Sequence, residues 1–518
     1  MQSFHLFGDS LMVRLHEDRS EGGLRRRFTG LSLAALVALA AGGCQSYERR
    51  PLDMTGHQAA FLARTPESPE VRTFAESLAA RSPAPAGGMV AFDPGDGITC
   101  EEAEVIALVF NADLRVARLR AGVTQANAEN AGLWEDPTIG VDLARIIQST
   151  PEPWKVFTSV GLTIPISGRL EIEKQRAGVE HAAELARVAQ REWMVRTSVR
   201  RAWSEWSALD AQLAVTRDFL SRVDQILSVV DKMEQAGEMA RTEARLFRIE
   251  KATKAADLAV LESRVREADL RLRQLMGMSP DAPLRLHAVG VGPTRSSVHS
   301  GTDTTELERR NPAMLVAAAE YEAAEKALEL EVRKQYPDLH IGPGYGREDG
   351  QDQVLLGLSL PIPILNANRR GIAEARAQRE VTRAAAEATL EQTIAAVRSA
   401  EVRLMGATQR RSTLESEIVP LVDAQYADAR QVARLGEVNT LVLLESLTRQ
   451  QEAKVGLVEA VRDEALAGVD LDELLGPEAM TSPGGPAANP VPSGAAAPSS
   501  GKPASESTPT NPTGAAAR

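Results

Sequence analysis

Aromatic side chains are scarce in this chain of 518 residues, at 4% of the sequence. Ala, Leu, Glu and Arg dominate instead. A chain with so little aromatic mass is poorly suited to one broad globular core. Its composition favours long helices that pack along seams of small side chains.

Basic surface and catalytic motifs are also missing. The formal net charge is −12 and no basic patch is interleaved with aromatics, which argues against a nucleic-acid partner. No nucleophile–base motif is present, so we predict neither enzyme activity nor a cofactor. His181 and Glu184 lie one helical turn apart, but no second ligand pair accompanies them, so we predict no metal site.

The N-terminus has the pattern of an export signal. Arg25–Arg27 give a positive start, and the apolar run Phe28–Ala41 is short for a membrane span. We assign residues 1–43 to a signal peptide. The segment before Cys44 resembles the lipobox of bacterial lipoproteins, which predicts lipidation of Cys44. Ordinary cleavage after Ala40 is the alternative.

A duplication at an interval of about 200 residues is the most informative pattern. Landmarks recur in the same order and at nearly the same offset. The pairs are Asn111 and Asn311, Pro137 and Pro337, Leu162–Ile166 and Leu358–Ile362, Gly237 and Gly436, and Gly277 and Gly476. The sequence therefore predicts two copies of one elongated unit.

These landmarks set the expected domain organisation. The first repeat spans 99–277 and the second spans 305–476, with a linker at 278–304. An extended segment, 44–98, leads from the lipid anchor to the first repeat. Residues 477–518 are rich in Pro, Ala, Ser and Gly, and we predict a disordered tail.

Each copy is expected to contain a helix, two strands, a very long helix, a glycine break and another long helix. The expected helices are 99–134, 170–235 and a third ending near 276 in the first copy, and 305–335, 370–435 and a third ending near 475 in the second. A helix of about 65 residues is on the order of 100 Å long. Helices of this length are expected to pack as coiled-coil pairs, with Pro420 kinking one of them.

The strands, about 138–166 and 338–361, alternate apolar side chains with small or polar ones. This pattern is typical of membrane barrels, and soluble hairpins packed on helices are the alternative. Aromatics lie at or near the strand ends, where membrane interfaces favour them. They are Trp134, Trp154, Phe157, Tyr336 and Tyr345. Four strands cannot close a barrel and open edges are not tolerated in lipid, so a membrane barrel requires several chains.

Together these residues resemble the outer membrane efflux channel family, the TolC-like outer membrane factors. The resemblance covers residues 99–476 and rests on the duplicated order. It implies a mainly α fold with a small β part. Each chain of a homotrimer would contribute four strands to a twelve-stranded outer-membrane β-barrel above a periplasmic α-helical coiled-coil tunnel. It also implies a channel in outer-membrane lipid, whose partners are a periplasmic adaptor protein and an inner-membrane pump, with an RND-type pump favoured.

The same resemblance points to site residues. The glycine breaks would be periplasmic tips that contact the adaptor, through Gly237, Glu238 and Glu243 in the first copy and Gly436, Glu437 and Val438 in the second. In the family, carboxylates six and nine residues past the second glycine form the narrowest ring. Here these positions are Val442, a departure, and Glu445, while Leu246 holds the matching place in the first copy.

Simpler interpretations stay open for these residues. The glycines could be turn residues alone, and Glu445 an ordinary solvated helix carboxylate. The family's basic partner of Glu243 would fall at Val438, so that latch is missing unless Arg241 or Arg434 replaces it. For the whole chain, the alternatives are a periplasmic adaptor lipoprotein and a coiled-coil scaffold. The cargo could be metal, drug, solvent or protein.

Overall fold

The computed structural model describes residues 47–81, 92–145, 147, 154–287, 304–348, 350–434 and 440–477. The chain divides into two compact units, 1–59 and 60–518. The second unit contains both repeats. Cys44, Gly436, Glu437 and Val438 lie outside the described residues. Within the described residues, none of the helices combines the length and the apolar character needed to cross a membrane.

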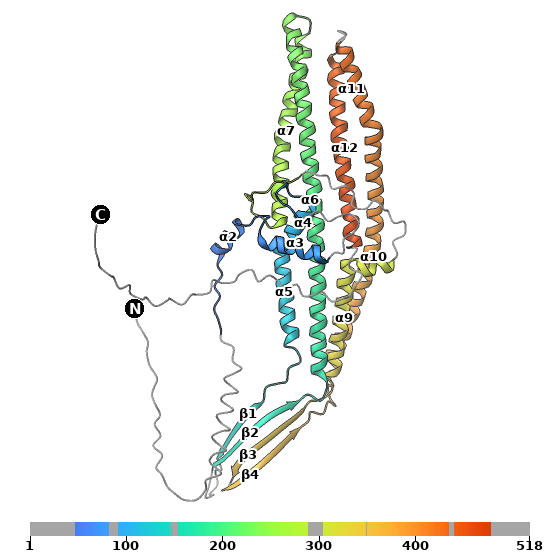
Figure 1. Cartoon of the computed structure of the whole chain (residues 1–518). Coiled ribbons are helices and arrows are strands. Elements are labelled where there is room, and N and C mark those ends of the chain that lie inside the picture. The colour runs from blue at the N-terminus through green and yellow to red at the C-terminus, as the bar shows by residue number, and fades with distance from the viewer. Residues whose placement is uncertain are drawn as a thin grey trace, which may run out of the picture. The chain divides into compact units, whose positions relative to one another are not determined.

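Helices dominate both copies (Figure 1). In the first copy they are α4 (Cys100–Phe110), α5 (Ala112–Glu129), α6 (Arg169–Ala236) and α7 (Arg241–Met276). In the second copy they are α8 (Thr304–Arg310), α9 (Pro312–Arg333), α10 (Arg369–Thr413), a π-helical turn (Leu414–Ile418), α11 (Val419–Arg434) and α12 (Thr440–Leu475). The element order repeats as the sequence predicts.

One antiparallel sheet carries the strands, in the order β1 (Thr138–Arg145), β2 (Trp154–Ile164), β3 (Leu339–Glu348) and β4 (Gln351–Ser359). The two copies therefore meet at β2 and β3. Pro343 lies within β3, and the β2–β3 ladder skips Gly342 and Pro343, because proline has no N–H to donate. The sheet lies at the end of the long helices opposite the α6–α7 turn (Figure 1).

The first helix of each copy breaks at an asparagine, so the prediction of one continuous helix over 99–134 and over 305–335 is wrong. Asn111 Oδ1 accepts a hydrogen bond from the Leu114 amide and so caps α5, while its Nδ2 donates to Leu275 O at 2.9 Å. In the second copy, Asn311 caps α9 and donates to Leu474 O at 2.6 Å. Each asparagine thus begins one helix and ties it to the end of another.

Gly277 and Gly476 end α7 and α12 beside these asparagines. Their φ angles are 69° and 75°, in the left-handed region. A Cβ on Gly277 would lie 2.2 Å from Phe110 O, and one on Gly476 would lie 2.1 Å from Arg310 O. Only glycine permits both the backbone turn and this close approach.

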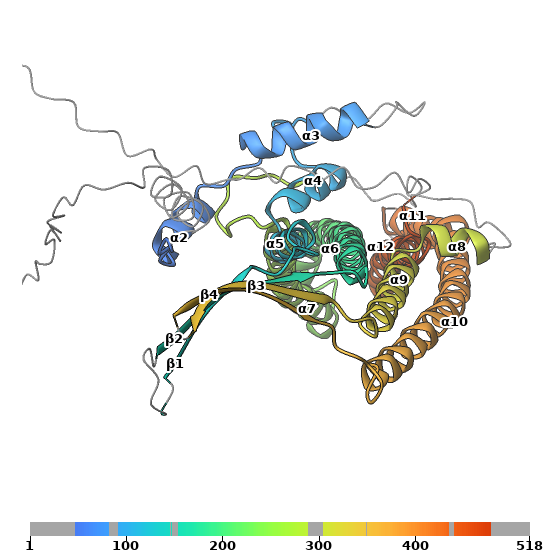
Figure 2. The same cartoon turned by 90° about the horizontal axis from the view of Figure 1, so that it is seen from below.

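α6 is the central element of the first copy, with 68 residues. It packs against α5 and α7 of its own copy and against α9 and α12 of the other. Seen along the helices, α6, α12 and α10 follow one another in a curved layer (Figure 2). Midway along α6, Trp203 and Trp206 are buried and meet edge to face at 5.4 Å, in a core with α4 and α7. Nearer the tips, Phe219 and Phe247 join Leu443 and Leu447 of α12 in a second core.

The second copy has a break that α6 does not have. The π-helical turn Leu414–Ile418 separates α10 from α11, and Pro420 follows directly. Proline lacks an amide hydrogen and crowds the carbonyl of the preceding turn, so a regular ladder cannot continue through it. This confirms the disruption expected at Pro420.

The segment before the first repeat is not simply extended, as its scattered prolines and glycines suggested. It contains α2 (Met54–Leu62) and α3 (Pro69–Arg81). Arg64 donates to Gly277 O at 2.6 Å, and its guanidinium stacks on Phe110. Arg64 thereby satisfies a carbonyl that the end of α7 leaves open, a contact between residues far apart in sequence.

Candidate functional site

One face of the sheet is apolar in every strand. Side chains alternate along a strand, so the pairing register assigns each to one of two faces. The apolar part of this face carries Ile139, Val141 and Leu143; Val156, Thr158, Val160, Leu162 and Ile164; Leu339, Ile341, Pro343 and Tyr345; and Val354, Leu356 and Leu358. At the hairpin end the same face also carries Arg145, Trp154, Arg347 and Asp352. Val141, Val354 and Leu358 are each about two-thirds exposed or more. Most of the sheet projects away from the helices of both copies (Figure 2).

The opposite face is small and polar. Thr163 Oγ1 and His340 Nδ1 lie 3.0 Å apart across β2 and β3, and Lys155 forms an ion pair with Glu348. Phe157 is the aromatic exception, and its ring covers Gly346 on the neighbouring strand. Phe157 therefore lies away from the apolar face, in contrast to Trp154 and Tyr345. An apolar face backed by a polar one is the arrangement of a barrel wall between lipid and water.

Both outer strands of the described sheet are edges. β1 pairs with β2 alone and β4 pairs with β3 alone. Each edge presents backbone N–H and C=O groups that need partners if the sheet lies in lipid. In lipid, such a sheet would need further strands along both edges.

The first tip is a tight turn between α6 and α7. Gly237 has φ 77°, and the Glu238 amide donates to Met233 O at 2.9 Å, which closes the end of α6. Met239 turns back into the core shared with Phe247, while Glu238 is exposed. The tip therefore presents a carboxylate to solvent on a backbone fixed by hydrogen bonds.

Ion pairs hold the two helices behind this turn. Arg248 of α7 bridges Asp231 at 2.7 Å and Glu234 at 2.5 Å on α6. Arg241 lies 3.9 Å from Glu234, so it faces its own hairpin. Glu243 is half-buried in the first turn of α7, and its amide donates to Ala240 O. Arg248 therefore braces this hairpin internally, whereas Arg241 is largely exposed.

The two candidate gate residues lie on the first turns of α12, after the second tip. Glu445 is 61% exposed at its side chain and accepts a hydrogen bond from Arg449 at 2.8 Å. This bond raises the pKa of the Arg449 guanidinium. Leu443 and Leu447, on the other side of the helix, are buried against α6 and α7. Val442 and Glu445 therefore lie on the side of α12 that turns away from the first copy.

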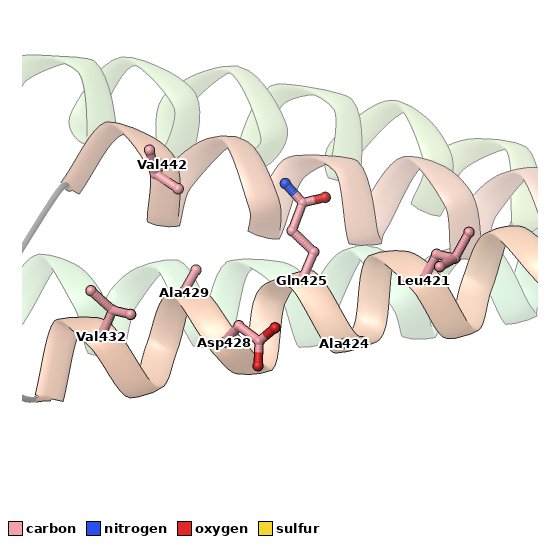
Figure 3. Close-up of a pocket in the computed structure, with 7 residues that line it drawn as sticks. All are labelled: Leu421, Ala424, Gln425, Asp428, Ala429, Val432 and Val442. Atoms are coloured by element: carbon pink, nitrogen blue, oxygen red, sulfur yellow. The ribbon is translucent and has the colours of Figure 1, made fainter.

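Val442 also lines a groove between α11 and α12 (Figure 3). The α11 side of this groove is formed by Leu421, Ala424, Gln425, Asp428, Ala429 and Val432. Leu421 is 70% exposed and Val432 is 44% exposed, so the groove is apolar and open at its margins. The structure places Val442 and Glu445 on one face of α12, as their spacing predicts. Their function as a gate stays a prediction.

A buried charge network, which sequence periodicity does not reveal, joins the two copies. Glu104 of α4 is 4% exposed and pairs with Arg196 and Arg200 of α6 at 2.7 and 2.5 Å. Arg200 also lies 3.7 Å from Asp472 of α12. Nearby, the Trp193 indole donates to Glu473 O at 3.1 Å. Buried ion pairs are costly to break, so this network fixes the register between α6 and α12.

Other candidate chemistry finds little support among the described residues. None of their His, Cys, Asp and Glu side chains gather in a group of three that could hold a metal ion. His181 contacts Thr124 Oγ1 at 3.0 Å instead. Cys100 is buried, and burial together with Glu104 raises the pKa of its thiol. Such a thiol is a packing residue rather than a nucleophile.

Comparison with known proteins decides the family. The sequence profile described as outer membrane efflux protein matches residues 105–278 and 305–477, about two-thirds of the chain. The chain belongs to the outer membrane efflux protein family. It is an outer-membrane channel of tripartite efflux systems, with a periplasmic helical part.

Individual relatives agree with this assignment. The chain is 23% identical to the cobalt-zinc-cadmium resistance protein CzcC of Cupriavidus metallidurans, over 73% of this chain and 90% of CzcC. The crystal structure of CusC has a TM-score of 0.63 at 15% identity, covering 73% of this chain and 92% of CusC. VceC of Vibrio cholerae gives 0.62 at 18% identity, covering 73% and 96%. The TolC-like fold predicted from the sequence is confirmed.

Proposed function

We propose that three copies of this efflux protein share one twelve-stranded barrel in the outer membrane. The observation that carries the proposal is the sheet itself, whose apolar face is exposed and whose outer strands are both unpaired edges. Pairing β1 of each copy with β4 of the next removes all edges and leaves the apolar face toward lipid.

The duplication supplies a second argument for this assembly. At the exit from β2, Ile166 and Ser167 lie beside Tyr336 and Pro337 of the second copy. At the matching exit from β4, Ile362 and Ile364 are about three-quarters exposed and Leu365 is 90% exposed. A neighbouring chain in the same arrangement would bring its own first copy, with exposed Leu133 and Trp134, against these side chains.

Subcellular fractionation and cross-linking test the assembly. A Trp134→Cys/Ile364→Cys protein, in a Cys100→Ala background, should form an interchain disulfide ladder up to the trimer in outer-membrane fractions. Trp134→Cys paired with exposed Val381→Cys of α10 is the matched control and should remain monomeric on a denaturing gel. A monomer in both cases, or absence from the outer membrane, contradicts the proposal.

In this assembly the helical tips contact a periplasmic adaptor. The contact residues are Gly237, Glu238 and Glu243 in the first copy and Gly436, Glu437 and Val438 in the second. The rigid turn at Gly237 and the exposed carboxylate of Glu238 support this role for the first tip. Glu238→Lys should weaken binding to the adaptor in a pull-down, whereas Glu262→Lys, midway along α7, should not. Equal binding by both variants would contradict the tip assignment.

Glu445 and Val442 form the constriction in this proposal. Three copies of Glu445 around one axis would favour cations, while Arg449, 2.8 Å away, reduces the repulsion among the carboxylates. Glu445→Ala should raise single-channel conductance in planar bilayers and lower cation selectivity. Glu452→Ala is the matched control, because Glu452 is also exposed, lies 3.8 Å from Arg449 and stands two helical turns along from Glu445. Unchanged conductance in Glu445→Ala would rule out this gate.

Heavy-metal cations are the cargo class that we propose, with an RND-type pump as the inner-membrane partner. The likeness to CzcC, whose name records cobalt, zinc and cadmium resistance, supports this choice. A deletion strain should lose growth in zinc or cadmium and keep its tolerance to organic drugs. Loss of drug tolerance alone would point to a drug-efflux partner.

Palmitate labelling that disappears in Cys44→Ala would establish the lipid anchor.

A further inference from the structure

Charge on the apolar face of the sheet is confined to one end. Following the register, the row nearest the β1–β2 hairpin contains Arg145 and Trp154, and the next row contains Leu143, Val156, Arg347 and Asp352. The rows beyond, toward the helices, carry no charged residue on this face in the described strands. They extend for about 20 Å along the strands.

The position of this charge is informative if the sheet lies in the outer membrane, as proposed above. The helices are attached to one end of the sheet and the two hairpins form the other (Figure 1). With the helices in the periplasm, the hairpin end faces outward. Arg145 and Arg347 then lie at the outer headgroup level, where a lipid-facing arginine costs little, rather than at the midplane, where it costs most.

Aromatic residues lie at the same end of this face as the two arginines. The Arg145 guanidinium stacks on the Trp154 ring at 5.4 Å, and Trp154 itself is 54% exposed. Tyr345 lies one row below Arg347 and hydrogen-bonds Asp352. Trp and Tyr favour the interface between hydrocarbon and headgroups.

We propose that Arg145 and Arg347, on either side of Trp154, bind the phosphate groups of an outer-leaflet lipid. The residues are two strands and one row apart, so their Cα atoms are separated by about 12 Å. Two guanidinium groups can approach one phosphorylated headgroup from that distance. The negative charge of Asp352 offsets one of the two positive charges, and Tyr345 forms a hydrogen bond with Asp352.

Lipopolysaccharide is the probe for this site, because its lipid portion carries phosphates and occupies the outer leaflet. The protein is purified in detergent, incubated with lipopolysaccharide, and the retained lipid is measured by native mass spectrometry. Arg145→Gln/Arg347→Gln should lower the apparent affinity by about ten-fold or more. Wild type should lose a similar factor when the lipid is dephosphorylated, and inorganic phosphate should compete weakly.

Lys155→Gln is the matched control. Lys155 is adjacent to Trp154 at the same height, but its side chain lies on the opposite, polar face with Glu348. This variant should bind lipopolysaccharide within about two-fold of wild type, because its charge does not face lipid. Arg145→Lys/Arg347→Lys keeps the charge without the paired donors and should recover part of the affinity.

The inference is overturned if the double glutamine variant binds as wild type does, if dephosphorylated lipid binds equally well, or if Lys155→Gln weakens binding as much. The inference rests on the proposed orientation in the membrane, and outer-membrane fractionation tests that proposal separately. Should wild type and variants all be missing from outer-membrane fractions, the proposed function itself fails. If wild type and variants fractionate with the outer membrane and export cargo, but the arginine substitutions leave lipopolysaccharide binding unchanged, only the phosphate site is refuted.

Discussion

Replacing Gly277 by alanine should destabilise this protein more than the same change at Gly237. Both glycines end a long helix and both have φ in the left-handed region, at 69° and 77°. Alanine in that conformation costs roughly 1–2 kcal/mol at either position. The two positions differ in what a new methyl group would meet.

At Gly277 the methyl carbon would lie 2.2 Å from Phe110 O and 2.5 Å from the Phe110 carbonyl carbon, whereas at Gly237 nothing lies within 4 Å. Retreat of the backbone at Gly277 would strain two hydrogen bonds, from Asn111 to Leu275 O and from Arg64 to Gly277 O. Overpacking of this kind adds roughly 1–3 kcal/mol. The expected cost is therefore about 2–5 kcal/mol at Gly277 and about 1–2 kcal/mol at Gly237.

Thermal unfolding in detergent, followed by circular dichroism at the helix band, measures the difference. A difference of 1 kcal/mol corresponds to about 2–4 °C in Tm for domains of 150–250 residues, so Gly277→Ala should melt several degrees below Gly237→Ala. Gly476→Ala repeats the test in the second copy, where the methyl carbon would lie 2.1 Å from Arg310 O. Equal Tm values for the Gly277 and Gly237 variants would refute the argument from close approach.

Three further predictions concern charge and burial. Glu104→Ala should lower stability by roughly 3–5 kcal/mol in chemical unfolding, because it leaves Arg200 largely buried beside an empty site; a loss below about 1 kcal/mol would contradict the network. Cys100, whose thiol pKa is raised by burial, should resist alkylation at pH 8 in the folded protein and react after unfolding, and fast reaction in the native state would contradict its placement. Although burial opposes its charge, hydrogen bonds from Asn368 and a neighbouring lysine hold the pKa of Glu331 below its usual value. The stability from Glu331 is therefore present above the unfolded pKa of about 4.3 and is lost as pH falls through the lower folded value. Wild type should lose more Tm than Glu331→Gln between pH 6 and pH 3, and parallel losses would exclude this contribution.

The duplication made much of the fold predictable from the sequence. Each landmark occurs once in each of the two aligned copies. A glycine or proline without a counterpart in the other copy can therefore be excluded as a landmark. α6 begins and ends within one residue of the predicted 170–235, because Gly168 and Gly237 bound it. The strands follow from strict alternation, which places Val354 and Leu358 on one face of β4 and Ser359 on the other.

The misses have a common physical origin in long-range contacts. Apolar spacing continues through Asn111, so periodicity alone gives one helix over 99–134. The break depends on Asn111 reaching Leu275, 164 residues away in sequence. Glu104 looks like a solvated helix carboxylate until α6 brings Arg196 and Arg200 against it. For the tips and gate, the sequence supplied positions through a family resemblance. The structure places the first tip in the turn between α6 and α7 and the gate residues on α12, and a ring would require the other chains of the proposed trimer.

The two copies differ in a way that bears on the proposed gate. α6 runs unbroken for 68 residues, and its hairpin with α7 is braced by Arg248. The matching span of the second copy is interrupted by the π-helical turn Leu414–Ile418, and the open groove lined by Val442 follows it. A helix bends most readily where its hydrogen-bond ladder is already irregular. We propose that the second copy, which carries Glu445, bends at this turn, while Leu246 occupies the matching position on the unbroken side. This asymmetry supports a division of labour in which the first copy is the fixed wall and the second copy moves to open the constriction.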